Sequence, residues 1–306
     1  MHTPPEITAK SWLSISLLGL IWGSTFLVIE IALEGITPFW LAAWRILIAA
    51  VLTSVVWGLG GWRLHLSEDR DWRGLLLFGL LSASLPFQLI SWGQQSVTSA
   101  FAGVSMASVA LIILPLAHFF LPNERITPRR LGGFIIGFIG VMVLMGPQLF
   151  ASTGESAEWL GRIACLLAAG CYASSSIILR RLPPIDAIGV SALPLVIGAV
   201  FAITAAFIVE GPPPPVDSKT AVALAVLGLI PTAGANLLRV QVTRTAGPVF
   251  MSLTSYQVPL WSVIFGVLLL DEPFDNSLVI SLSLILAGVG VSQYHGIKKL
   301  LSGSKG

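Results

Sequence analysis

Apolar residues run along this chain in blocks of helix length, separated by short polar breaks. About 20 apolar residues are enough to cross the hydrocarbon core of a bilayer. In lipid the backbone must satisfy its own hydrogen bonds, so such a block forms a helix. The pattern therefore predicts an all-α membrane protein with ten transmembrane helices at 12–33, 37–59, 73–92, 98–119, 129–146, 159–179, 187–209, 219–238, 248–270 and 276–294.

Composition agrees with a lipid-embedded surface. The chain has 306 residues, of which 55% are apolar and only 10% charged. Soluble domains carry about 25% charged residues, so this chain cannot cover the surface of a soluble globule of its length. The first block is too long for the core of a signal peptide and is expected to be retained as a helix. The longest connections, 60–72, 120–128, 147–158 and 210–218, leave no room for a soluble domain.

Basic residues gather in every second connection. Ten helices put both termini on one side of the membrane, and fourteen of the seventeen lysines and arginines fall on that side. Arg162 and Lys219 fall on the opposite side, and Arg45 lies within a block. Connections rich in Lys and Arg stay in the cytoplasm. We therefore expect a multi-pass protein of the cell (inner) membrane with both termini cytoplasmic.

The two ends of the chain share a layout. Glu124 and Glu272 each follow an apolar block, and each is followed sixteen residues later by Gly-Val-x-Val. The polar segment 147–158 separates five blocks from five. An odd number of helices in each half means that the halves insert in opposite orientations. The sequence predicts two inverted five-helix repeats, 1–146 and 159–306, joined by a linker at 147–158, as in many secondary transporters.

Further correspondences lie inside the blocks. Trp22-Gly-Ser-Thr in the first block matches Tyr172-Ala-Ser-Ser in the sixth, and Pro86 in the third matches Pro231 in the eighth. A pair of interrupted helices at matching places indicates a binding site between repeats. The alternative is that both prolines are kinks that a membrane helix tolerates. Amides and hydroxyls lie close to both prolines: Gln88, Ser91, Thr232 and Asn236.

At this point the chain resembles the drug/metabolite transporter superfamily, of the ten-helix EamA type. The matching features are 21–26 (Ile-Trp-Gly-Ser-Thr-Phe), Trp44-Arg45, and the two acidic residues with their following glycines. They are short, but together they extend over nearly the whole chain. The resemblance implies export or exchange of small metabolites, with amino acids a frequent substrate class. Ten tryptophans make the chain similar to exporters of aromatic amino acids.

Polar residues near the middle of the blocks are the candidate substrate contacts. Hydroxyls in membrane helices often only bond to neighbours, whereas an unpaired amide in lipid costs several kcal/mol and should face protein or water. We expect a central cavity bounded by the first, third, fourth, sixth, eighth and ninth helices, and Gln257 is the strongest candidate on its wall. The full set is Trp22, Ser24, Thr25, Gln88, Tyr172, Ser175, Asn236, Tyr256 and Gln257.

Arg45 is the cation deepest within a block. Charges inside membrane helices mark functional sites by default. Glu30 lies at a comparable depth, so a buried Glu30–Arg45 ion pair is the favoured interpretation. No carboxylate is expected at the midplane, which argues against lipophilic cations as substrates and favours a zwitterionic or neutral solute. Cys165 and Cys171 are six residues apart on one helix, which suggests neither a disulfide nor a metal pair.

These features favour a carrier that exports or exchanges small organic metabolites, amino acids first, by alternating access. The expected partners are a small-molecule substrate and the lipid bilayer, with no nucleic acid, no cofactor and no metal. The alternative is a non-transporting membrane scaffold or receptor subunit. An intramembrane enzyme ranks third, because the sequence holds no zinc-protease, nucleophile-elbow or P-loop motif. Gly133, Gly137 and Gly140 form a small-residue face that could meet the tenth helix of the same chain or another subunit.

Overall fold

The computed structural model describes residues 8–62, 69–121, 126–145, 156–182, 188–246, 248–251, 253–273 and 276–301. Glu124 and most of the predicted linker lie outside these ranges, as does the side chain of Tyr256. The described residues form helices and no strand. They are α1 Ala9–Leu33, α2 Pro38–Leu59, α3 Asp69–Gly79, η1 Leu80–Ser84, α4 Leu85–Gly93, α5 Ser99–Ser105, α6 Ser108–Phe120, α7 Pro128–Met145, α8 Ser156–Arg181, α9 Gly189–Glu210, α10 Ser218–Leu227, η3 Gly228–Gly234, α11 Ala235–Ala246, α12 Pro248–Met251, α13 Thr254–Leu269 and α14 Asn276–Leu301.

Seven stretches of these helices are long and apolar enough to cross a membrane, which confirms a multi-pass membrane protein. They are Ala9–Leu33, Pro38–Leu59, Trp72–Gly93, Ser99–Phe120, Glu158–Arg181, Gly189–Glu210 and Ser218–Arg239. The other three predicted blocks are helical too, as α7, α12 with α13, and α14. Two of them hold shorter apolar helices, Gln257–Leu269 and Asn276–Ser292. Ten membrane spans therefore stay a prediction.

Polar side chains mark where several of these helices begin. The Thr8 hydroxyl accepts a hydrogen bond from the backbone of Ser11 at the start of α1, and the Thr98 hydroxyl accepts one from Phe101 N at the start of α5. Such caps satisfy backbone N–H groups that have no partner within the helix. Asp217 caps α10 in the same way, 2.8 Å from Thr220 N. Hydrogen bonds from Thr220 lower the pKa of the exposed Asp217 carboxyl from its ordinary value.

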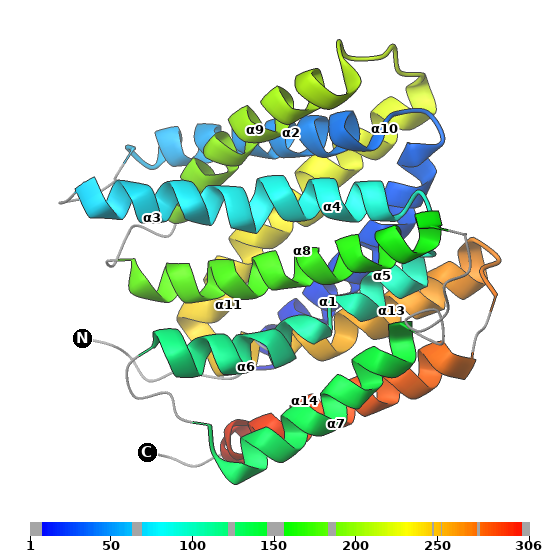
Figure 1. Cartoon of the computed structure of the whole chain (residues 1–306). Helices are drawn as coiled ribbons and strands as arrows, with labels where there is room; N and C mark the ends of the chain where they lie inside the picture. The colour runs from blue at the N-terminus through cyan, green and yellow to red at the C-terminus, as the bar shows by residue number, and fades with distance from the viewer. Residues whose placement is uncertain are drawn as a thin grey trace.

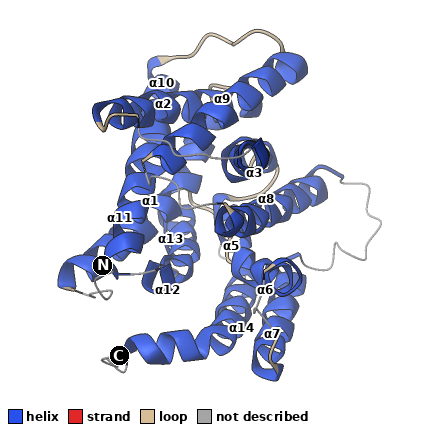
Figure 2. Ribbon diagram, turned by 90° about the vertical axis from the view of Figure 1, so that its left-hand side faces the viewer, coloured by secondary structure: helices blue, strands red, loops and turns tan. Residues whose placement is uncertain are grey.

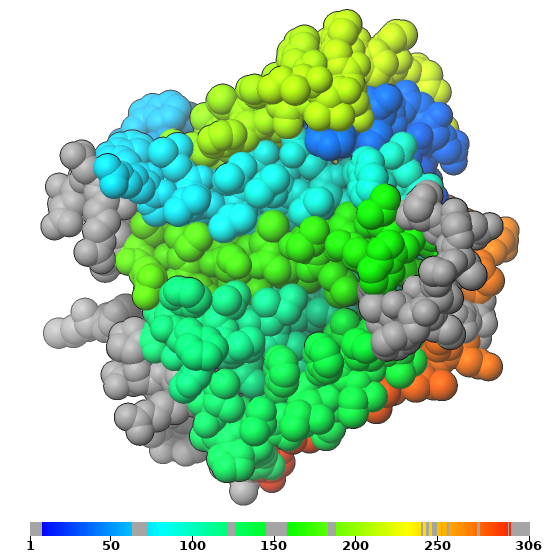
Figure 3. All heavy atoms as spheres, viewed as in Figure 1, coloured from blue at the N-terminus to red at the C-terminus, as the bar shows by residue number. Residues whose placement is uncertain are grey.

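The helices pack as two layers held between two helix pairs. One layer contains α1, α10 with α11, and α13, and the other contains α3 with α4, α6 and α8 (Figure 2). The α2–α9 pair closes one edge of the bundle and the α7–α14 pair closes the other. Both chain ends lie at the same end of the bundle (Figure 1), which we call the terminal end; the opposite end is the far end. Side chains fill the spaces between α9, α4, α8 and α6 on the face that Figure 3 shows.

Contacts between the two halves of the chain come in equivalent pairs. α1 packs on α13 as α8 packs on α6, and α1 packs on α10 and α11 as α8 packs on α4. Likewise α2 packs on η3 as α9 packs on η1. The α2–α9 and α7–α14 pairs each join one helix to its counterpart, five blocks later. The two halves thus use their helices in equivalent ways.

The glycine face of α7 meets α14 of the same chain. A Cβ added at Gly140 would lie 2.8 Å from Cγ1 of Ile285, and one at Gly133 would collide with the carbonyl oxygen of Gly288. Gly137 faces Leu111 of α6 as well as the backbone of Gly288. Close approach of this kind is what small residues allow between membrane helices. Of the two partners considered from sequence, the structure shows the one within the chain.

Two helices contain a π-helical turn at matching places. η1 ends at Ser84, two residues before Pro86, and η3 contains Pro231. The two segments begin 148 residues apart, the same separation as Glu124 and Glu272. This confirms a matched pair of interruptions near the two prolines. π-Helical turns occur frequently at functional sites, because they displace backbone groups from the regular ladder.

The helix breaks in the fourth and ninth blocks do not coincide with the prolines of those blocks. Pro115 and Pro259 lie inside the continuous helices α6 and α13. The breaks come earlier, between the end of α5 at Ser105 and the start of α6, and between the end of α12 and Thr254. Membrane helices tolerate proline where neighbouring groups satisfy the freed carbonyl. The two breaks are therefore similarly placed in both halves, although the prolines are not.

Candidate functional site

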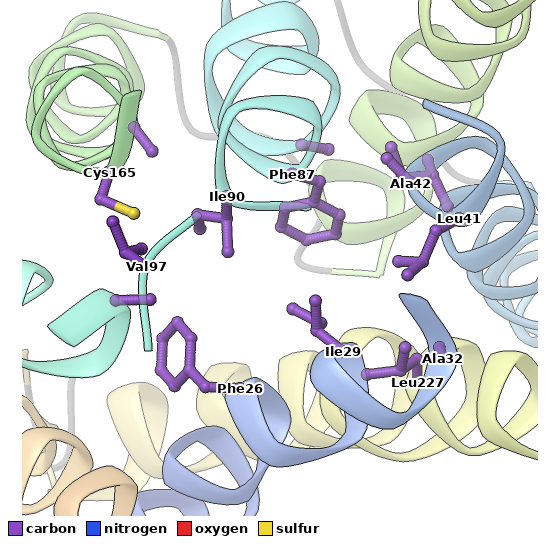
Figure 4. Packing of buried hydrophobic residues seen from close by; sticks show 14 of the residues in the cluster. Phe26, Ile29, Ala32, Leu41, Ala42, Phe87, Ile90, Val97, Cys165 and Leu227 are labelled. Atoms are coloured by element: carbon purple, nitrogen blue, oxygen red, sulfur yellow. The ribbon is translucent and has the colours of Figure 1, made fainter. Parts of the chain in front are cut away.

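Apolar side chains join the two layers toward the far end. Phe26 and Ile29 of α1 point toward Phe87 and Ile90 of α4 (Figure 4), and all four are at most 8% exposed. They belong to the main core, which takes residues from both layers. A second core, built on α1, α11 and α12 around Phe250, contains no residue of the other layer. The shared packing of the layers therefore lies in the half of the bundle away from the termini.

Polar contacts reinforce the far end. The Glu272 carboxylate accepts hydrogen bonds from Ser99 N at 2.7 Å and Ala100 N at 3.0 Å, at the first turn of α5. A negative group stabilises a helix N-terminus, where N–H groups are unpaired and the helix dipole is positive. This contact ties the connection after α13 to the first half of the chain. Gln94 Nε2 donates to Phe26 O at 3.0 Å and to Glu30 Oε2 at 3.3 Å, also at this end.

Arg45 lies between the two interrupted helices. Its side chain is buried, and Nε donates to Thr232 Oγ1 at 2.8 Å, within η3. Thr232 Oγ1 in turn donates to Leu227 O at 2.7 Å. The guanidinium lies over the Phe87 ring at 4.0 Å from its centre, one residue after Pro86. Thr232 belongs to η3 and Phe87 to α4, so groups from both layers contact Arg45.

The predicted Glu30–Arg45 ion pair is not formed. Glu30 accepts from Gln94, whereas Arg45 donates to Thr232, and no ion pair joins the two among the described residues. Similar depth in the membrane does not place two side chains on facing sides of their helices. The rotation of α1 turns Glu30 toward the end of α4, and the rotation of α2 turns Arg45 toward η3.

Four predicted contact residues have partners within the protein. Trp22 Nε1 donates to Pro231 O at 3.1 Å. Ser24 and Thr25 both donate to Ile21 O, at 2.9 and 3.0 Å, and Ser175 donates to Tyr172 O at 2.8 Å. The hydroxyl bonds stay within one helix, as expected for hydroxyls that only pack. The Trp22 bond, in contrast, joins α1 to the π turn of η3.

The predicted amides divide into two kinds. Gln88 Nε2 donates to Ala202 O at 3.3 Å and is buried against α9, so it faces the α2–α9 edge. Asn236 and Gln257 are partly buried, and neither side chain has a hydrogen-bond partner among the described residues. Gln257 packs on Gly19 of α1, where an added Cβ would lie 2.6 Å from the Gln257 Cβ. Both remain candidates for a bound solute.

The structure brings part of the predicted set together around η3. Trp22 and Arg45 donate hydrogen bonds to the successive residues Pro231 and Thr232. Thr232 was noted from sequence for its place beside Pro231 but was not included in the contact set, and Phe87, which directly follows Pro86, was not considered. Adjacency to Pro86 and Pro231 was the signal that could have found them.

In the part of the chain that the structure describes, neither the potential metal ligands nor the groove between α2 and α9 forms a site for a polar solute. Among the described residues no cluster of His, Cys, Asp and Glu could hold a metal ion. A groove of about 430 Å³ lies between α2 and α9, and its lining is almost entirely apolar. Val51 and Val200 on this groove are 58% and 62% exposed, as suits a surface that faces lipid.

Comparison with known proteins accounts for this architecture. The sequence pattern of the EamA-like transporter family matches residues 10–146 and, a second time, residues 159–293. The chain belongs to this family. The family match supports a membrane fold of two repeats and a transporter that is not expected to be an enzyme.

Relatives of similar length are transporters by name. The uncharacterized transporter YoaV of Bacillus subtilis is 23% identical over 93% of this chain and 97% of its own length. An S-adenosylmethionine/S-adenosylhomocysteine transporter of Chlamydia trachomatis is 23% identical over 90% of this chain and 86% of its own length. A solved crystal structure, 19% identical, covers 95% of this chain and 99% of its own with a TM-score of 0.65, which shows that the fold is shared.

Proposed function

We propose that this EamA-family chain is a non-enzymatic carrier that exports or exchanges a small organic metabolite, an amino acid or an amino-acid derivative. The halves 1–146 and 159–306 are two inverted five-helix repeats joined by the linker 147–158. The observation that carries the proposal is the matched pair of π turns, η1 and η3, in helices that both contact α2. Interrupted helices at equivalent places of two repeats are how many carriers build a solute site.

The distribution of contacts supports alternating access. The two layers share their core, the Glu272 cap and the Gln94 contacts toward the far end. The second core at the terminal end belongs to one layer alone. Rocking of one layer against the other would break the far-end contacts and replace them at the terminal end. The structure is thus the state of the proposed cycle that is closed at the far end.

The substrate class rests on polar side chains that have unused hydrogen-bonding groups. Two amides that have no hydrogen-bond partner in the part of the chain that the structure describes, and one guanidinium, suit a solute with both donors and acceptors. A relative named for S-adenosylmethionine, itself an amino-acid derivative, agrees with this class. The tryptophan content does not extend the proposal to aromatic amino acids. Trp12, Trp62 and Trp72 are exposed near helix ends, and Trp40 donates to Gly211 O at the far end.

A scaffold or receptor subunit is the second candidate. A bundle that needs only cohesion gains nothing from two matched π turns or from amides left without partners, since each costs stability. Uptake of a labelled metabolite panel into liposomes that hold the purified protein, with and without a pH gradient, separates the two functions. We expect saturable uptake of at least one amino acid or derivative. If no compound enters these liposomes faster than it enters protein-free liposomes, the scaffold function is favoured.

Topology gives the first prediction. On a background without Cys165 and Cys171, an impermeant maleimide added to intact cells should label Asp217→Cys but not Trp62→Cys. Both positions are exposed, Asp217 at the far end and Trp62 at the terminal end. The reason is the excess of Lys and Arg on the terminal side, which keeps that side cytoplasmic. Permeabilised cells should label at both positions; labelling of Trp62→Cys alone in intact cells would reverse the orientation.

The unpaired amides give the second prediction. Gln257→Leu and Asn236→Leu should each lower the initial rate of solute exchange about tenfold, the effect of about 1.4 kcal/mol of lost interaction. Folding should be unaffected, because neither amide has a hydrogen-bond partner to lose among the described residues. The matched control is Gln241→Leu, an exposed glutamine on α11. If all three variants exchange solute at the wild-type rate with equal expression, the two amides only pack.

A further inference from the structure

Arg45 is a buried cation without an anion. The residue is 5% exposed, yet its contacts among the described residues are neutral: the Thr232 hydroxyl and the face of the Phe87 ring. In the described part of the chain no carboxylate lies within ion-pair distance of its guanidinium. A buried charge is normally paired, because desolvation without a partner costs several kcal/mol. The missing partner is the observation that requires an explanation.

The hydrogen bonds that are present leave one edge of the guanidinium available. A guanidinium carries five N–H donors in one plane. Among the described residues only Nε is used. It donates to the Thr232 hydroxyl, whose own hydrogen is donated to Leu227 O, so that the hydroxyl oxygen faces Arg45. The Phe87 ring supports the plane from one side. The two Nη nitrogens, which have no acceptor among the described residues, form the edge that binds a carboxylate with two parallel hydrogen bonds.

The position of Arg45 suits a solute that must be released on either side. Thr232 belongs to the second half and Phe87 to the first, and each follows the proline of a matched interruption. Thr232 lies in η3 and Phe87 lies in α4, on the opposite layer. A group bound here therefore contacts both halves, and rearrangement of the halves changes its surroundings directly.

We propose that Arg45 is the subsite for the carboxylate of the transported solute. This rests on the proposed carrier function and names the part of the solute that is recognised. A single guanidinium matches a single negative charge, and the side chains that contact Arg45 in the described part of the chain, Thr232 and Phe87, include no second cation. A phosphate, which carries up to two charges, would lack its second partner. A small inorganic anion and a purely structural role for Arg45 are the other outcomes that the test separates.

The experiment compares carboxylates with neutral isosteres. Thermal midpoints of the detergent-purified full chain are measured with propionate and with propionamide at equal chloride concentration, for wild type, Arg45→Gln, Arg45→Lys and Thr232→Val. In liposomes, exchange of an amino acid is compared with exchange of its carboxamide. Wild type should prefer the carboxylate at least tenfold, and Arg45→Gln should abolish that preference. Thr232→Val keeps the charge and should retain most of the preference, and Arg45→Lys should retain part of it.

Several results would overturn the proposal. One is a wild-type protein that binds propionate and propionamide equally, and another is an Arg45→Gln variant that keeps the carboxylate preference. If chloride alone reproduces the stabilisation, the subsite binds an inorganic anion instead. If the protein transports only neutral solutes, the carrier function is supported and the carboxylate subsite is contradicted. Carboxylate binding that depends on Arg45, without any transport, would support the subsite and contradict the carrier function. If Arg45→Gln elutes as an aggregate, the wild-type preference and Arg45→Lys decide.

Discussion

Replacing Glu272 with glutamine should open the far end of the bundle. The carboxylate accepts two hydrogen bonds from the first turn of α5, and glutamine offers only one acceptor oxygen and would turn an amide donor toward a backbone N–H. Charge-assisted bonds of this kind contribute about 2 kcal/mol, which corresponds to a change of about thirty-fold in the ratio of closed to open protein. A cysteine at Phe26, buried between the layers, should react faster with an impermeant maleimide by a comparable factor.

Two further variants make this test specific. Gly266→Ala should have the same effect, because an added Cβ would collide with Glu272 Oε2 and lie 3.0 Å from Ser99 Oγ. Glu34→Gln is the matched control: this acidic residue lies at the same end, but its ion pair with Lys219 is exposed and contributes little. Equal labelling rates in Glu272→Gln and Glu34→Gln would show that the cap does not hold the far end closed.

Gly288→Ala should destabilise the protein by about 3 kcal/mol, at the upper end of what overpacking usually costs. An added Cβ would collide with the Gly133 carbonyl oxygen and the Gly137 backbone N, and would lie 2.7 Å from Gly137 Cα. All three are backbone atoms of α7, so no side-chain rotation relieves the collision and the helices must separate. The measurement is the thermal inactivation midpoint of the purified protein in detergent.

The control for this variant lies two residues away. Gly290→Ala is on the same helix, and no atom lies within 4 Å of its added Cβ. It should be neutral or slightly stabilising, since alanine is the better helix former. Equal midpoints for the two variants would mean that the α7–α14 contact is not as close as the structure has it.

Helix positions could be predicted well because lipid imposes a single requirement on them. The block 37–59 became α2, Pro38–Leu59, and the block 187–209 became α9, Gly189–Glu210. Backbone hydrogen bonding inside a bilayer leaves no alternative to a helix, so hydropathy decides both the type and the bounds. The glycine face of α7 was recognisable for a similar reason: small residues permit close approach and little else explains them.

Side-chain partners were much less predictable. The depth of a residue in the membrane follows from its position in an apolar block. The direction of its side chain depends on how the helix is rotated about its axis, which is decided by packing against other helices. Glu30 and Arg45 illustrate the difference, because they share a depth and still contact Gln94 and Thr232 respectively. The cap of α5 by Glu272 joins residues 173 positions apart and leaves no local trace in the sequence. The matched prolines predicted which helices are interrupted, but they did not indicate that Arg45 lies between these helices.

The π turns also change how the faces of two helices should be drawn. A π turn holds about one residue more than an α turn, and one residue corresponds to about 100° around the axis. Residues on the two sides of η1 or η3 therefore do not share a face at the usual spacing of seven. A single helical wheel for 69–93 or 218–246 would assign half of each helix to the wrong neighbour. Two wheels per helix, joined with a phase shift at the π turn, place Phe87 and Asn236 in their true directions.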